Sequence, residues 1–225
     1  LINLPMESTI LYDYLRNIYA TILFKDVVKR YKVREVSLLE NLVTYLADNT
    51  GNLISAKKIS DFLKSQKIKI SPNSILNYLS HLEKSFFIFK ARRADVSGKK
   101  IFELGEKYYF EDLGLRNSII GYRHKDIADI LENIVYIHLK IAGYTVYVGW
   151  DKGKEIDFVC TKNNEKMYVQ VCYLIPDQKV HTREFGNLLN IKDQYPKYVV
   201  SMDTDVESEY LGVKHVPLIQ FISKL

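Results

Sequence analysis

Two short apolar segments that lie close together in the chain constrain its fold most. The segments are residues 154–159 (KEIDFV) and residues 167–173 (MYVQVCY), and the polar stretch 161–166 between them is rich in Asn, Lys and Glu. Both segments alternate or run apolar in the manner of β-strands, and the polar stretch is typical of a turn. The sequence therefore predicts a β-hairpin here.

Alternation within this predicted hairpin brings polar side chains together. Residues two apart in a strand share a face. Glu155 and Asp157 should therefore point to one side, and Gln170 should share a side with Cys172 on the second strand. Two neighbouring strands can thus present a carboxylate and an amide to a common point, although solvent-facing polar residues on an ordinary hairpin explain the same pattern.

A long apolar segment precedes the hairpin. Residues 126–142 read DIADILENIVYIHLKIA, with Asp126 in the N-cap position and Gly143 just past the end, which predicts a helix. Its apolar residues cover more than one face, so burial on both sides is expected. Glu132 lies in the middle of this helix. A carboxylate among aliphatic side chains is costly unless it is paired or bound to a cation, so Glu132 should be either a hydrogen-bonded core residue or part of a site.

The order of these segments resembles that of the PD-(D/E)XK nuclease superfamily. The common features are a helix with an embedded Glu, a strand at 144–150, and the EIDFV and VQVCY segments of the hairpin. Residues 107–225, which include KYYFEDLGLRN at 107–117 and LEN at 131–133, more closely resemble the uncharacterised C-terminal domain attached to a family of prokaryotic AAA-type ATPases. The resemblance implies a restriction-endonuclease-like mixed sheet covered by helices.

The resemblance also implies four catalytic positions. Asp157 would be the metal-binding Asp, and Gln170 would occupy the acidic position. Cys172 would occupy the lysine position, and Glu132 would be the helical acid. The implied ligands of a Mg²⁺ ion are therefore Asp157, Gln170 and Glu132.

Two of these four positions depart from the superfamily pattern. Mg²⁺ prefers anionic oxygen, so the neutral carbonyl of Gln170 adds no charge to hold the ion. The thiol of Cys172 replaces an amine that would stabilise negative charge, and loss of one such group typically costs about 10² to 10³ in rate. We therefore expect a nuclease-like domain without a full catalytic set. An active Mg²⁺-dependent endonuclease is the alternative, if a displaced amine comes from Lys152, Lys154 or Lys166.

The charge is distributed unevenly. The chain has a formal net charge of +5, and residues 1–105 contain 17 Lys and Arg against 10 Asp and Glu, whereas the remainder contains 15 against 17. The basic half is the better candidate for contact with nucleic acid. The nuclease-like half lacks the positive field that such an enzyme would use.

Residues 36–104 have the pattern of a winged-helix domain, with Ser55 and Ser71 as helix N-caps. Three helices are expected at 36–48, 56–66 and 72–84, followed by a hairpin over 86–103. The third helix should bury Ile75, Leu76, Leu79 and Leu82. Such a domain can place its third helix in the major groove of DNA and its wing on phosphates.

The candidate nucleic-acid contacts lie on the third helix and on the wing. They are Asn73, Asn77, Lys84, Arg92, Arg93, Lys99 and Lys100. Winged helices also act between proteins, so a protein–protein interaction module without nucleic-acid binding is the other alternative.

Three segments complete the expected organisation of an α/β chain that is α+β overall. Residues 1–35 should form a helical segment leading out of a missing ATPase core, residues 36–104 the winged-helix domain and residues 105–225 the nuclease-like domain. No Gly-rich phosphate loop occurs, so ATP would bind only through a domain absent from this chain. No cofactor is otherwise certain, and Mg²⁺ is expected only for an active nuclease.

Composition bears on the location and the partners of the protein. No apolar run approaches the length of a membrane span, no signal-peptide pattern occurs, and Cys160 and Cys172 have no zinc-type spacing. We expect a cytoplasmic protein without membrane contact. Because the chain begins at Leu1, we expect a fragment of a longer protein, with DNA and the ATPase domain of that protein as partners.

Overall fold

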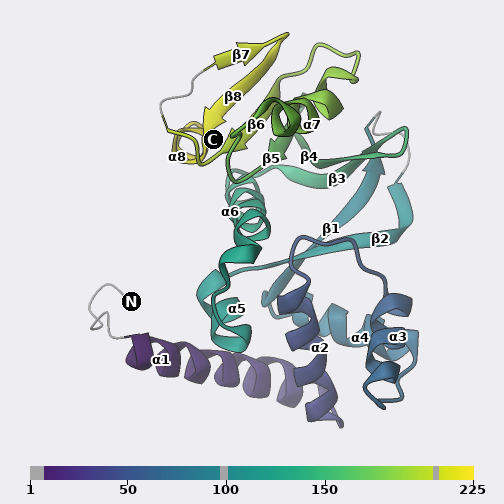
Figure 1. Ribbon diagram of the computed structural model, residues 1–225. Helices are drawn as coiled ribbons and strands as arrows, with labels where there is room; N and C mark the ends of the chain where they lie inside the picture. The colour runs from purple at the N-terminus through teal and green to yellow at the C-terminus, as the bar shows by residue number, and fades with distance from the viewer. Residues whose placement is uncertain (1–7, 97–100, 205–207) are drawn as a thin grey trace. The chain divides into compact units, whose positions relative to one another are not determined.

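The computed structural model describes residues 8–96, 101–204 and 208–225, and its fold is mixed α/β, as expected from the sequence (Figure 1). The strands form one mixed eight-stranded sheet in the order β2-β1-β3-β4-β5-β6-β8-β7. The chain divides into two compact units. The first unit comprises residues 1–90 and 108–124, and the second comprises residues 91–107 and 125–225.

The first unit is helical. Its elements are α1 (Ser8–Thr21), the π-helix η1 (Ile22–Lys29), α2 (Val36–Asp48), α3 (Ala56–Ser65), α4 (Pro72–Lys84) and α5 (Leu113–Ile120). Both predicted N-caps are confirmed, since Ser55 Oγ accepts a hydrogen bond from Lys58 N and Ser71 Oγ accepts one from Ser74 N. Each cap satisfies an amide that the first turn of its helix leaves without a partner.

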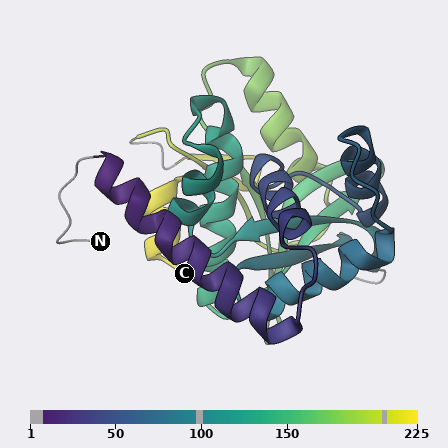
Figure 2. The ribbon, with the colours of Figure 1, turned by 90° about the horizontal axis from the view of Figure 1, so that it is seen from below.

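A helical segment was expected over residues 1–35, and its described part contains two kinds of helix. α1 continues directly into η1, and Figure 2 shows the two as one uninterrupted ribbon. Leu23 and Val27 of η1 are fully buried in the core of the first unit. Asp26 O accepts a hydrogen bond from Ser85 Oγ at 3.1 Å, so a side chain from beyond α4 also holds this wider helical segment in place.

The buried stripe of α4 is narrower than predicted. Ile75, Leu79 and Leu82 are buried, but Leu76 is 49% exposed. Positions 75, 79 and 82 follow the i, i+4, i+7 spacing of one helix face, whereas position 76 lies about 100° further round. The prediction that Leu76 is a core residue is therefore wrong.

The second unit contains most of the sheet. β1 (Ile88–Asp95) begins in the first unit, and β2 (Ile101–Phe110) ends there. The other strands lie wholly in the second unit; they are β3 (Thr145–Asp151), β4 (Lys154–Lys162), β5 (Glu165–Val171), β6 (Lys197–Ser201), β7 (Ser208–Tyr210) and β8 (Val213–Pro217). Its helices are η2 (His124–Asp126), α6 (Ile127–Ile141), α7 (Gln178–Leu189) and α8 (Leu218–Ser223). β4 and β5 pair antiparallel, which confirms the predicted hairpin, and α6 confirms the predicted helix. Asp126 occupies the N-cap position of α6, although its side chain makes no capping hydrogen bond.

The two strands expected to form the wing hairpin, β1 and β2, are neighbours at one edge of this sheet. β1 pairs in parallel with β3, with Arg93 opposite Val148 and Asp95 opposite Trp150. Residues 91–107 consequently belong to the second unit, and the expected boundary between residues 104 and 105 falls inside β2. Residues 97–100 of the predicted hairpin lie outside the described residues.

A β-bulge in β4 determines which side chains of this strand face α6. Tyr147 is opposite Val159 and Gly149 is opposite Ile156, so β4 contains one more residue than β3 between these two pairs. Phe158 contacts Tyr136 of α6, whereas Ile156 and Val159 belong to the apolar cluster that contains residues of α7. Such a bulge interrupts the alternation of the strand at this point.

None of the helices in the described part of the chain is both long and apolar enough to cross a membrane.

Candidate functional site

A buried lysine lies among three carboxylates in the second unit. Lys107 Nζ of β2 is 2.8 Å from Glu132 Oε1 of α6 and 2.7 Å from Glu155 Oε1 of β4. The same nitrogen is 4.0 Å from Asp157 Oδ1. Lys107 is 3% exposed, and Glu132 and Asp157 are buried as well. The predicted sharing of one side by Glu155 and Asp157 is confirmed, because both carboxylates meet the same ammonium group.

The remaining oxygen of Asp157 is also engaged by the protein. Asp157 Oδ2 accepts a hydrogen bond from Val171 N at 2.8 Å, and Gln170 Oε1 accepts one from Asp157 N at 3.4 Å. The described β4–β5 pairs end at Phe158 and Val169. Two side chains therefore continue the connection between the strands where their backbone pairing stops.

Burial and charge shift the pKa values within the cluster. Burial alone would lower the pKa of Lys107, but attraction to Glu132, Asp157 and Glu155 outweighs it and raises the pKa. Burial raises the pKa of Asp157, and repulsion from Glu132 adds to this effect, while Lys107 and the Val171 amide oppose it. The ammonium is thus the firmly charged member, and it compensates carboxylates that would repel one another without it.

The arrangement does not fit a bound Mg²⁺ ion. Among the described residues, no three His, Cys, Asp or Glu side chains are placed to hold a metal. The Lys107 ammonium lies where the carboxylates converge, and Asp157 Oδ2 is occupied by a backbone amide. Metal ligands need free anionic oxygens that point to one place. The structure brings Asp157, Gln170 and Glu132 near one another, but it directs their oxygens to protein donors.

Cys172 takes no part in the polar cluster. It is 4% exposed and belongs to an apolar group with Phe185 and Leu188. Burial raises the pKa of its thiol to about 12, with the charge of Glu184 as the next cause. Both Cys160 and Cys172 are free and buried, so the residue at the expected lysine position is a neutral core side chain.

The amine in the cluster comes from a residue that the sequence did not single out. Lys152 and Lys154 are exposed, and Lys166 Nζ donates a hydrogen bond to Val96 O at 2.6 Å. None of these three has a contact with Glu132 or Asp157 among the described interactions. The only sequence signal for Lys107 is its position at the start of KYYFEDLGLRN. There, a single Lys directly precedes three aromatic residues, and all three are buried in the structure.

The predicted nucleic-acid contacts fall in both units. Asn73, Asn77 and Lys84 are exposed on α4 of the first unit. In the second unit Arg92 is exposed, whereas the guanidinium of Arg93 lies 4.8 Å from the centre of the Trp150 ring. The predicted contacts Lys99 and Lys100 lie outside the described residues.

A group of lysines at the end of α3 and in the loop that leads to α4 was not predicted. Lys64, Lys67 and Lys69 line a surface hollow together with Ile70 and the N-cap Ser71. The first unit contains 15 Lys and Arg against 10 Asp and Glu, and the second contains 17 against 17. The whole formal net charge of +5 therefore falls on the first unit.

Comparisons with known proteins find uncharacterized relatives. An uncharacterized protein of Haemophilus influenzae is 36% identical over 218 residues, which cover 97% of this chain and 53% of that protein. An uncharacterized protein of Methanocaldococcus jannaschii is 31% identical over 172 residues, which cover 75% of this chain and 37% of that protein. The chain thus spans about half the length of the first relative and less of the second. No solved structure matches the chain significantly.

A family description matches residues 3–126, which include Lys107 but end before Glu132 and the hairpin. This match covers more than half of the 225 residues. The chain therefore belongs to the family described as a domain of unknown function (DUF8612).

Proposed function

We propose that this chain is a nucleic-acid-binding region of a longer, ATPase-linked protein, and that its nuclease-like second unit does not catalyse cleavage. The observation that carries the binding proposal is the concentration of positive charge on the first unit, with Lys64, Lys67 and Lys69 between the end of α3 and the N-cap Ser71 of α4.

The start of α4 suits phosphate groups for two reasons. Backbone amides in the first turn of a helix point outward, and the helix dipole favours negative charge there. Three lysine side chains beside Ser71 add the positive charge that displaces counterions from DNA. Asn73 and Asn77 follow on the exposed face of the same helix and offer further polar contacts. We therefore propose contact mainly with the phosphate backbone, without strong sequence preference.

The winged-helix interpretation belongs to this proposal. α2, α3 and α4 supply the three helices in the expected order, and β1 follows directly. Exposed Arg92 on β1 is a further candidate phosphate contact, whereas Arg93 packs on Trp150.

The nuclease-like interpretation of the second unit rests on the order α6, β3, β4, β5, α7, β6, with β4 and β5 antiparallel and β5 and β6 parallel. The proposal that this unit is inactive rests on Lys107. Its ammonium already neutralises the carboxylates that a metal would need, and no free oxygen set replaces them among the described residues.

The link to an ATPase rests on the resemblance of residues 107–225 and on the length of the relatives. The matched region covers 53% of the Haemophilus influenzae protein, which leaves about half of that protein for another domain. ATP would then act through a domain outside this chain, and that domain would be its first protein partner.

Fluorescence anisotropy with a short labelled duplex tests the binding proposal. The variant Lys64→Gln, Lys67→Gln, Lys69→Gln should bind more weakly than wild type at every KCl concentration. The slope of log affinity against log salt should fall by up to about 2.7, because each phosphate that a lysine neutralises adds about 0.9 to this slope. The matched control is Lys152→Gln, Lys179→Gln, Lys192→Gln, which removes the same charge from exposed positions of the second unit.

The outcomes separate the alternatives. Equal weakening in both triple variants would show that net charge alone matters and would contradict a site at α4. No binding by the wild-type chain would favour a protein–protein interaction module. Cleavage of supercoiled DNA with Mg²⁺ or Mn²⁺ that disappears in Asp157→Ala would overturn the proposed inactivity of the second unit.

A further inference from the structure

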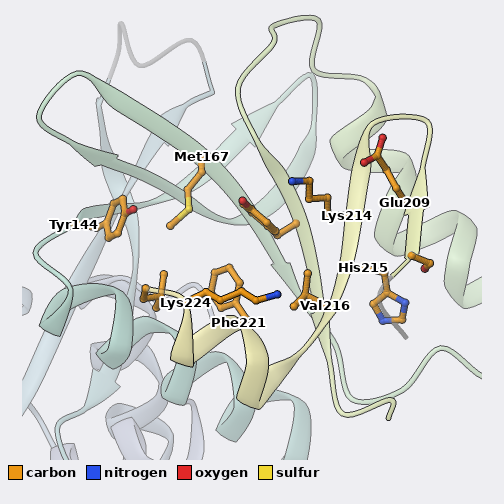
Figure 3. A pocket seen from close by; sticks show the side chains of 11 residues that line it. Tyr144, Met167, Glu209, Lys214, His215, Val216, Phe221 and Lys224 are labelled. Carbon is orange, nitrogen blue, oxygen red and sulfur yellow. The ribbon is translucent and has the colours of Figure 1, made fainter. Parts of the chain in front are cut away.

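A cavity of about 450 Å³ lies in the second unit (Figure 3), and its lining includes none of Lys107 and the three carboxylates around it. Its lining comes from the start of β3 and from β5, β6, β8 and α8, with Ser208 and Glu209 of β7 at one side. Small-molecule sites are typically concave, largely apolar and about 300 to 1,000 Å³ in volume. This cavity has the size and the composition of such a site.

Flat rings form much of the cavity surface. Tyr144, Tyr198 and Phe221 all line it, and the rings of Tyr198 and Phe221 lie 5.5 Å apart between their centres. Met167 of β5 adds a polarizable thioether beside them (Figure 3). Aromatic side chains of this kind pack against a ligand ring in offset or edge-to-face arrangements, and methionine sulfur contacts rings favourably.

Positive charge accompanies these rings. Lys214 and Lys224 line the cavity, and Figure 3 shows the amine of Lys214 higher in the view than Phe221 and Val216. Glu209 is the one acidic side chain among the lining residues, and it is the strand partner of Lys214. In Figure 3 the amine end of Lys214 extends to the side away from Glu209, and no ion pair joins the two among the described contacts. The cavity therefore offers the Lys214 ammonium to an incoming ligand.

Polar groups on the aromatic wall are also available. Within the described part of the chain, neither the Tyr144 nor the Tyr198 hydroxyl has a hydrogen-bond partner, and Lys214 Nζ has neither a hydrogen bond nor an ion pair. A cavity with an apolar floor and a few polar groups that the protein leaves unused can orient a small ligand. Charge-assisted hydrogen bonds from an ammonium would fix an anionic group on that ligand.

We propose that this cavity binds a small ligand that has a flat aromatic ring and one anionic group. The ring would lie among Tyr198, Phe221 and Met167, and the anion would meet Lys214. A phosphate and a carboxylate satisfy this chemistry equally, so the probes have to distinguish them. The site is independent of the nucleic-acid binding proposed for the first unit.

Methionine methyl NMR on the full 225-residue chain tests the proposal, because Met167 lines the cavity and Met202 lies outside its lining. The charged probes are adenosine 5′-monophosphate and 1-naphthoate. Adenosine and 1-naphthamide lack the charge, and ribose 5-phosphate lacks the ring. We expect at least one charged probe to shift the Met167 signal and leave Met202 in place, with assignment by Met167→Leu. Its neutral counterpart should bind at least about fivefold more weakly.

The variant Lys214→Ala should weaken binding of that probe by about fivefold to tenfold. This lysine is exposed, so its removal should not impair folding. Lys179→Ala on α7 is the matched control, since it removes an exposed charge of the same unit outside the lining, and it should leave affinity unchanged. Tyr198→Leu, checked for folding by its thermal transition, should weaken the ring contact.

Any of three results would overturn the proposal. The first is that neither charged probe shifts the Met167 signal at millimolar concentration. The second is equal binding of charged and neutral probes, and the third is binding by Lys214→Ala as tight as that of wild type. Preference for adenosine 5′-monophosphate over 1-naphthoate would identify a phosphate ligand, and the reverse would identify a carboxylate. Loss of DNA binding in the α4 lysine variant without loss of probe binding would keep the two sites distinct.

Discussion

The ammonium nitrogen of Lys107 lies 2.8 Å from Glu132 Oε1, and the two side chains are 4% and 10% exposed. A buried ion pair adds little net stability relative to apolar residues, but removal of one partner leaves an uncompensated charge in a poorly solvated place. Here the imbalance is larger, because Glu155 and Asp157 lie around the same ammonium. The stability of the second unit should therefore depend on the lysine more than on any one carboxylate.

We expect Lys107→Met to lower the free energy of unfolding by about 3 to 5 kcal/mol, the cost of leaving a buried charge unpaired. The replacement keeps an unbranched side chain of similar length, so removal of the charge is the main change. Urea unfolding followed by circular dichroism measures the effect. Lys154→Met is the matched control on an exposed position of the same unit, and equal destabilisation by the two variants would contradict a special role for Lys107.

Removal of the Glu132 carboxylate should partly reverse the destabilisation that Lys107→Met causes. In the double variant Lys107→Met, Glu132→Leu, one of the uncompensated carboxylates is replaced by an apolar side chain, so stability should rise above that of Lys107→Met alone. The same unfolding measurement, arranged as a double-mutant cycle, gives the coupling between the two residues. Additive effects of the two substitutions would show that the 2.8 Å contact contributes nothing specific.

Local patterns predicted much of the site, and tertiary contacts account for what was missed. Strand alternation correctly placed Glu155 and Asp157 on one side, and the costly position of Glu132 within an apolar helix indicated either a hydrogen-bonded core residue or part of a site. The partner itself was not predictable by these means, because Lys107 is 25 residues away from Glu132 and no periodicity connects them. A residue is brought to such a contact by the fold as a whole.

In the rest of the fold, too, local patterns were predicted correctly and features that depend on tertiary contacts were not. Ser55 and Ser71 marked helix starts correctly because capping is local. The division of the chain was not local, since pairing of β1 with β3 assigns residues 91–107 to the second unit. Helix spacing shows that Ile75 and Leu76 lie on different faces of α4. Which of the two faces is buried depends on where the core lies, and local sequence does not give that.

Gly149 should tolerate no side chain. A Cβ at this position would lie 2.8 Å from Val159 Cγ2 and 3.0 Å from Ile156 Cβ, because the bulge in β4 brings these groups against β3. We expect Gly149→Ala to lower the unfolding free energy by about 1 to 3 kcal/mol. Gly186→Ala in α7 is the matched control. A Cβ there meets nothing within 4 Å, so this variant should gain about 0.5 to 1 kcal/mol from helix propensity. Unfolding curves that rank the two variants in the opposite order would contradict the observed packing.

Stability should decrease as the pH falls below about 6.5, the ordinary pKa of histidine. Burial lowers the pKa of His215, and the nearby His181 adds to this effect while Asp203 opposes it. The unfolded chain then binds a proton that the folded chain resists, so unfolding is favoured as the pH falls through this range. His215 Nε2 lies 2.7 Å from Ser201 Oγ, a contact that glutamine can partly replace.

Urea unfolding between neutral and mildly acidic pH measures this dependence. We expect His215→Gln to lose less stability over the acidic part of the range than wild type does. A remaining slope is expected from His81 of the first unit, because burial and the charge of Lys84 lower its pKa as well. Identical slopes in wild type and His215→Gln would show that this histidine does not resist protonation.

Arg92 and Arg93 are adjacent in the sequence but should differ in what their removal does. Arg92 is exposed, so Arg92→Ala should reduce the slope of DNA affinity against salt by about 0.9, the effect of one phosphate contact. Arg93 lies over the Trp150 ring at 4.8 Å, and such a cation–π contact is worth roughly 0.5 to 1 kcal/mol at a partly exposed site. Arg93→Ala should therefore lower stability by that amount and leave the salt slope nearly unchanged. Anisotropy titrations at several salt concentrations, paired with unfolding curves of both variants, separate the two effects. If both arginines change the slope equally, the ring contact does not withhold Arg93 from DNA, and β1 presents two phosphate contacts instead of one.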